Sequence, residues 1–191
     1  MISTEFQNLK LTQRFQMFDL DGDGFVSRSD FESVARRIAE ALGVPIDNPK
    51  AQAVRDAYLA IWNVVATKMN IDPITRIDVE KFKVATQSVI LAQGELGYKQ
   101  TLGPAIDAIA QLTDTDGDGK ISEEEYTKLI QAIGGRKEDA ANTYGRLDSN
   151  RDGVVSIDEL AQTLREFFYA GDTNAVGSEL YGSVESSLKG S

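Results

Sequence analysis

Three aspartates, a serine and a glutamate lie within residues 114–125 at a spacing that suits a hard metal ion. In a twelve-residue loop, oxygen-bearing side chains would fall at positions 1, 3, 5, 9 and 12, with Gly119 at position 6. Ca²⁺ prefers about six to eight oxygen ligands and a loop that turns sharply at its sixth residue. The predicted ligands are Asp114, Asp116, Asp118, Lys120 through its backbone carbonyl, Ser122 directly or through water, and Glu125 through both oxygens.

The same arrangement occurs at two other places in the chain. The copy nearest the N-terminus offers Asp19, Asp21, Asp23, Phe25, Ser27 and Asp30. The last copy offers Asp148, Asn150, Asp152, Val154, Ser156 and Glu159. A turn followed by a helix-capping Ser-x-x-Glu would explain one copy. Three copies between helical patterns instead indicate EF-hands that bind three Ca²⁺ ions.

The first loop differs from the other two at its closing residue, which is Asp30 instead of glutamate. A shorter side chain reaches the ion less easily and favours one coordinating oxygen over two, which makes Mg²⁺ a better competitor. The alternative is that the backbone moves closer to the ion and restores the shell. Both interpretations stay open from the sequence.

Residues 70–81 align with the three loops but lack their metal chemistry. Ile74 stands at the position-5 ligand, Thr75 at the turn glycine, and Lys81 puts a cation at position 12. The apolar residue at position 8, which pairs loops through a short strand, is kept in all four copies as Val26, Ile77, Ile121 and Val155. The stretch therefore predicts a structural hand that pairs with the first loop and binds no ion.

The pattern of helices and loops predicts an all-α fold of four EF-hands in two paired lobes, packed compactly and linked by short two-stranded β pairs. We expect an N-terminal pair in residues 1–94 and a C-terminal pair in 95–170, with a break at 94–97. The apolar face of helix 49–69 is expected to be core. The tail 171–191 has enough apolar residues to dock on the core, although a disordered end is the alternative.

Composition limits the functions available. The net charge of −10 argues against nucleic acid and anionic membranes as partners. The absence of Cys and His removes disulfides and the commonest general base, so no enzyme is predicted. The N-terminus lacks the pattern of a signal peptide, and no apolar run approaches the roughly 20 residues of a membrane span. We expect a cytoplasmic monomer.

With its functional first, third and fourth loops and decayed second loop, the chain resembles the sarcoplasmic calcium-binding protein and calerythrin family over about residues 5–182. Asp30, the long segments of the N-terminal half and the Arg-Glu-Phe-Phe-Tyr-Ala-Gly-Asp stretch at 165–172 add to the likeness. Calmodulin-like proteins fit less well, because their spacing is more regular. The resemblance implies a compact protein that buffers or transports Ca²⁺.

Two other functions compete with buffering. A calcium sensor that regulates a partner would favour a Met-rich groove, but the chain has only three Met. A carrier could hold an apolar ligand between the halves, near Tyr58, Trp62 and Phe82. Related photoproteins use His around their substrate, so the absence of His argues against light emission. No protein target is indicated, and buffering is preferred.

Overall fold

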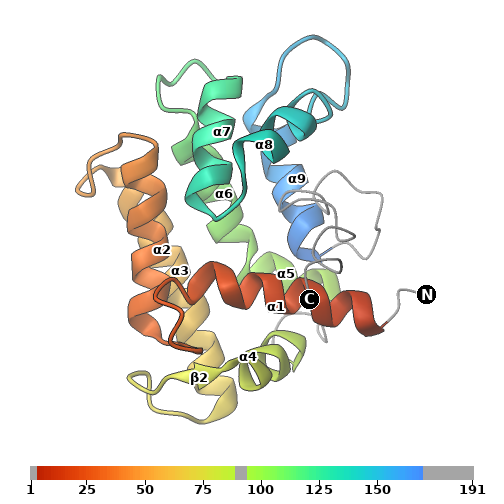
Figure 1. Cartoon of the computed structure of the whole chain (residues 1–191). Coiled ribbons are helices and arrows are strands. Elements are labelled where there is room, and N and C mark those ends of the chain that lie inside the picture. The colour runs from red at the N-terminus through yellow and green to blue at the C-terminus, as the bar shows by residue number, and fades with distance from the viewer. Residues whose placement is uncertain (1–3, 89–93, 170–191) are drawn as a thin grey trace.

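The computed structural model describes residues 4–88 and 94–169, which are mainly helical (Figure 1). In chain order the elements are α1 (Thr4–Phe18), β1 (Phe25–Val26), α2 (Arg28–Ala41), α3 (Pro49–Met69), β2 (Ile77–Asp78), α4 (Val79–Thr86), α5 (Gly94–Thr101), α6 (Gly103–Thr113), α7 (Glu123–Ala132), α8 (Lys137–Tyr144) and α9 (Ile157–Tyr169). The predicted all-α fold is confirmed. Within the described ranges, no helix is both long enough and apolar enough to cross a membrane.

Helix starts are fixed by capping residues that the sequence supplies. The side chain of Asn48 accepts a hydrogen bond from the amide of Lys50 at 2.8 Å, and Pro49 occupies the first turn of α3. Ser122 and Glu125 form a reciprocal capping box at the start of α7. The helices that leave the first and third loops, α2 and α7, both begin at such a capping box, which fixes where the closing carboxylate points.

The loops pair as the sequence predicted. Strands β1 and β2 are antiparallel, with Val26 opposite Ile77, so the decayed loop supports the first one. In the other pair, the amide of Ile121 donates to the carbonyl of Val155 at 2.8 Å. All four of these position-8 residues are buried. The metal loops are thus held in pairs by backbone hydrogen bonds and an apolar contact.

The buried position of the decayed loop gives a testable difference between two isoleucines. Ile77 is 1% exposed and Ile74 is 85% exposed. Replacing Ile77 with Val should lower the free energy of unfolding by about 1 kcal/mol, because a buried methyl group is lost. The same change at Ile74 should alter it by less than about 0.5 kcal/mol. Urea unfolding of the calcium-loaded protein, followed by far-UV circular dichroism, measures both; equal effects would contradict a structural role for the loop.

One apolar cluster joins the N- and C-terminal halves. Helix α3 lies beside α6, and α2 lies beside α7. Trp62 is fully buried at the centre of the N-terminal half, and its indole N–H donates to the carbonyl of Pro73 at 2.8 Å. The rings of Phe18 and Phe31 stack nearby, with their centroids 4.0 Å apart. The cluster continues through α6, α7 and α9, so apolar surface from both halves is covered by the fold itself.

The expected boundary between the halves at residues 94–97 stays a prediction, and locally these residues are helical, because they begin α5. A separate interruption of the helical backbone lies at Leu102, between α5 and α6. Pro104 sits in the first turn of α6, where its missing N–H costs no helical hydrogen bond but prevents continuation from α5. The expectation for the tail 171–191 falls outside the described residues.

Candidate metal centres

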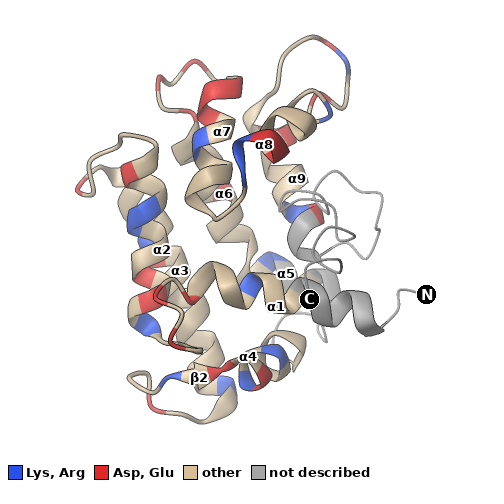
Figure 2. Ribbon diagram, viewed as in Figure 1, with Lys and Arg blue, Asp and Glu red and all other residues tan. Residues whose placement is uncertain are grey.

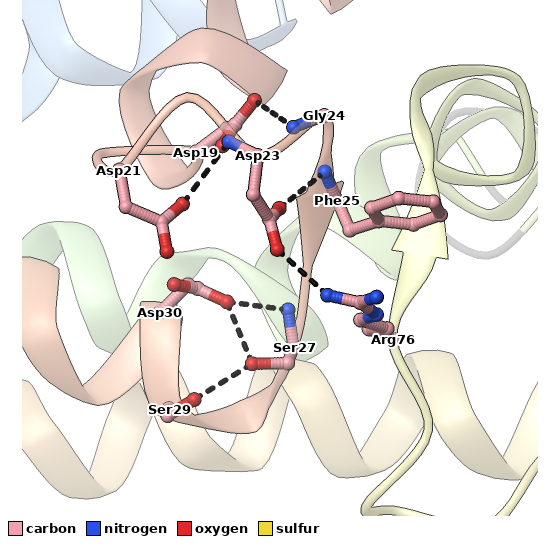
Figure 3. A network of polar contacts seen from close by, with 9 residues as sticks. All are labelled: Asp19, Asp21, Asp23, Gly24, Phe25, Ser27, Ser29, Asp30 and Arg76. Carbon is pink, nitrogen blue, oxygen red and sulfur yellow. Dashed lines mark hydrogen bonds and ion pairs between the residues drawn. The ribbon is translucent and has the colours of Figure 1, made fainter.

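Acidic side chains converge in the first and third loops. In the first, carboxylate oxygens of Asp19, Asp21 and Asp23 all lie within 4.8 Å of one another (Figure 3). The three aspartates at positions 1, 3 and 5 of the third loop meet the same limit. Figure 2 shows further acidic residues on the first turn of α7, directly after the third loop. Oxygens at this separation can coordinate one hard cation.

Glycine is required by the backbone at position 6 of each loop. Gly24, Gly119 and Gly153 have φ of 81°, 82° and 87°. This is the left-handed region, which other residues enter at a cost. The amide of each glycine donates to the position-1 aspartate of its own loop, at 3.1, 3.3 and 2.9 Å in the same order. The turn therefore orients the first ligand of every site.

Backbone amides also orient the aspartates at position 5. The residues at position 7, whose carbonyls are the predicted backbone ligands, donate their amides to these aspartates at 2.8, 2.8 and 2.9 Å: Phe25 to Asp23, Lys120 to Asp118 and Val154 to Asp152. In the fourth loop the amide of Asp152 donates to both Asp148 and Asn150, at 3.1 and 2.8 Å. Side chains at positions 1, 3 and 5 are thus gathered in all three loops.

Glu125 closes the third loop by bonding to both of its ends. One carboxylate oxygen accepts from the amide and hydroxyl of Thr115, at 2.8 and 2.7 Å. The other accepts from the amide and hydroxyl of Ser122, at 2.9 and 2.8 Å. Burial raises the pKa of Glu125, but these four hydrogen bonds outweigh it and hold the pKa below its usual value. The carboxylate is thereby kept ionised over the loop.

Glu159 repeats this arrangement in the fourth loop. It accepts from the amide and hydroxyl of Ser156, both at 2.9 Å, and from those of Ser149, both at 3.0 Å. The Ser156 amide is the main cause that lowers its pKa, to about 2; burial opposes this, and bonds from Ser149 and the Asn150 amide add to it.

The depressed pKa of Glu159 gives a pH dependence with a definite sign. Its usual value is 4.5, so ionised Glu159 stabilises the fold above about pH 4.5, and that stabilisation is lost as the pH falls towards 2. In protein prepared without calcium, the free energies of unfolding of the wild type and of Glu159→Gln should differ near pH 5 and converge near pH 2. Urea titrations across this range measure the gap; a gap independent of pH would mean that these hydrogen bonds do not form.

Asp30 does not span the first loop as the two glutamates span theirs. One of its oxygens accepts from the amide and hydroxyl of Ser27, at 2.8 and 2.6 Å (Figure 3). At the other end of the loop, the amide of Leu20 donates to the carbonyl of Phe18 instead. One oxygen of Asp19 is buried without a hydrogen-bond partner among the described residues. A cation would satisfy this oxygen, which supports the fit of the loop to a metal ion.

Sequence reasoning missed two kinds of contact around these loops. The first is the side-chain hydroxyl at position 2, from Thr115 or Ser149. The sequence contained this information, because both loops that close with glutamate have a hydroxyl residue at position 2, whereas the loop that closes with aspartate has Leu20. The second is long-range, because the ammonium group of Lys50 on α3 donates to the carbonyl of Asp114 at 2.7 Å. The N-terminal half therefore contacts the first residue of the third loop directly.

Comparison with known proteins agrees with this geometry. The EF hand family model matches residues 12–35, 111–130 and 145–164, which contain the three candidate loops. The chain is 30% identical to calerythrin of Saccharopolyspora erythraea over 168 residues, which covers 88% of this chain and 95% of calerythrin. It is 32% identical to the luciferin-binding protein of Renilla reniformis, with 92% of each chain covered.

More distant relatives extend the comparison. A sarcoplasmic calcium-binding protein of Scylla paramamosain is 22% identical, covering 88% of this chain and 91% of that protein. Among solved structures, a calcium-binding protein from Streptomyces coelicolor that acts in prokaryotic calcium-mediated regulation superposes with a TM-score of 0.70. The two are 25% identical, and the match covers 87% of this chain and 99% of the other.

Proposed function

This chain belongs to the calerythrin and sarcoplasmic calcium-binding protein family of EF-hand proteins, and from that premise we propose that it binds three Ca²⁺ ions and acts as a calcium buffer. The ligands are the residues at positions 1, 3, 5, 7, 9 and 12 of the first, third and fourth loops. When bound, each ion supplies a divalent charge that neutralises the gathered carboxylates. The proposed setting is the cytoplasm, and the proposed state is a monomer whose role is not catalytic.

The observation that favours a calcium buffer over a calcium sensor is the apolar cluster shared by the two halves. A sensor uses calcium to expose an apolar groove, whereas buffer EF-hands open little. Here the pairs α3–α6 and α2–α7 cover apolar surface from both halves. The small number of Met residues also supports a protein that does not adapt to many targets.

A ligand carrier is the alternative suggested by the luciferin-binding relative. A cavity between the halves is lined by residues of α1, α2, α3, α4 and α6, among them Tyr58, Ile61 and Ile106, and it measures about 40 Å³. Small-molecule sites usually measure about 300–1,000 Å³. Because this cavity, formed by described residues, is far smaller, it would have to widen to hold such a ligand, so we prefer buffering.

Calcium titration calorimetry with an apolar-surface dye in the same samples tests buffering against sensing. Three tight sites with little change in dye fluorescence are expected of a buffer. Weaker, cooperative binding with a large rise in dye fluorescence would contradict buffering and favour a sensor with a protein target.

Competition by Mg²⁺ is proposed to be strongest at the first loop, because Asp30 bonds to only one side of it. Replacing Asp30 with Glu should tighten Ca²⁺ binding there about tenfold and reduce the effect of millimolar Mg²⁺, since a longer side chain can offer both oxygens. Paired Ca²⁺ titrations with and without Mg²⁺ measure this. Asp158→Glu is the matched control, because Asp158 is exposed and holds no predicted ligand position.

A further inference from the structure

A cation from the decayed second loop reaches into the first metal loop. The guanidinium group of Arg76 donates to the second carboxylate oxygen of Asp23 at 2.7 Å (Figure 3). Its central carbon also lies 4.4 Å from the centroid of the Phe25 ring. Arg76 is thus held by an ion pair and by a cation–π contact, both with residues of the first loop.

The pairing of the two loops places Arg76 there. Val26 lies opposite Ile77 and Phe25 opposite Asp78 in the β1–β2 ladder. Arg76 directly precedes β2, so the antiparallel register places it opposite Ser27, the residue that follows β1, from where its side chain reaches Asp23 and Phe25. The contact is a consequence of the strand register, although 53 residues separate the ion-pair partners in sequence.

Asp23 holds position 5, so Arg76 contacts a predicted metal ligand. One oxygen of Asp23 already accepts from the Phe25 amide at 2.8 Å, and the other accepts from Arg76. An ion that binds the second oxygen must displace the guanidinium or share the oxygen with it. In either case a positive charge remains close to a divalent cation and opposes its binding.

The other two sites lack this feature. Asp118 and Asp152 hold position 5 there, and neither has an ion-pair partner among the described residues. At position 7, which Arg76 occupies in its own loop, the third and fourth loops have Lys120 and Val154. The first site alone combines an aspartate at position 12 with a cation on its position-5 ligand.

We propose that Arg76 is a built-in competitor of the metal at the first site, so that the decayed hand sets the affinity of its partner loop. This inference rests on the proposed function of the three loops. Competition by Arg76 makes the first site the last to fill as the calcium concentration rises. Calcium binding at this site releases Arg76 from Asp23. The second hand thereby regulates binding without holding an ion.

The test is Arg76→Gln in the full chain, with binding at each loop followed separately through the amide resonances of Gly24, Gly119 and Gly153. The side chains of both ion-pair partners are partly exposed, at 61% for Arg76 and 39% for Asp23, so we expect a moderate gain in calcium affinity. Calcium affinity at the first loop should rise about 3- to 10-fold, and the other loops should stay within about twofold. The gain should shrink at high salt.

Two further variants separate the contact from net charge. Arg55→Gln removes one positive charge from an arginine that pairs with the exposed Asp56, so first-loop affinity should not change more than about twofold. Arg76→Lys keeps the charge and should stay close to the wild type. In the wild type, the side-chain N–H resonance of Arg76 should shift as the first loop fills.

Unchanged or weaker calcium binding at the first loop of Arg76→Gln would overturn the proposal. An equal gain at all three loops, or the same gain in Arg55→Gln, would also overturn it, because net charge would then be the cause. A wild-type chain that binds no calcium at any loop would instead overturn the proposed function, so the two failures are distinguishable.

Discussion

Replacing Glu125 with Gln is expected to weaken calcium binding at the third loop about 100-fold, while the first and fourth loops stay within about twofold. The carboxylate is the proposed two-oxygen ligand that closes the shell. It also accepts four hydrogen bonds, from Thr115 and Ser122. A carboxamide offers one acceptor oxygen and turns its NH₂ group towards groups that are themselves donors, so both the ion and the loop lose a partner. Calorimetry with site-resolved amide resonances measures the loss.

Glu123→Gln is the matched control for this change. Glu123 lies in the same first turn of α7, is exposed, and holds no predicted ligand position. Its replacement changes the net charge equally and should leave all three affinities within about twofold. Equal losses in the two variants, or none in Glu125→Gln, would contradict the register that places Glu125 at position 12.

The parts of this fold that follow a local repeat could be predicted from the sequence. An EF-hand loop fixes its own turn, its strand pairing and its exit helix, so aligning position 8 was enough to predict Val26 opposite Ile77. The residues that hold α3 at its start, Asn48 and Pro49, also act within a single turn. These features depend on neighbours in sequence, which is why a pattern reveals them.

Features that depend on tertiary packing could not be predicted in this way. Gly94 and Gly97 favour a break by propensity, yet both lie in α5, where Gly97 is buried and the helix packs on α3 and α6. The contact of Arg76 with Asp23 depends on the register between loops and on one side-chain rotamer. No periodic signal in the sequence marks such contacts, although they decide how similar loops differ.

Removing calcium is expected to produce the largest change in stability. Carboxylate oxygens held within 4.8 Å of one another repel by about 1–4 kcal/mol per pair, depending on the local dielectric constant. An ion that binds only the folded state adds about 4 kcal/mol per site when its concentration is 1,000 times the dissociation constant. Three such sites would add on the order of 10 kcal/mol, which is comparable to the whole stability of a typical domain.

The calcium-free protein should therefore melt at a much lower temperature than the calcium-loaded protein, and its near-UV circular dichroism should weaken as aromatic packing loosens. The ring centroids of Trp62 and Phe31 lie 5.4 Å apart in the N-terminal core, and both rings are part of the packing that this signal reports. Glu159→Gln is the internal control, because it should remove one site's share of the calcium-dependent stabilisation and leave the rest. Identical melting temperatures and near-UV spectra in chelator and in calcium would show that the gathered carboxylates are not coupled to folding, and the core would then have to hold the loops together without metal.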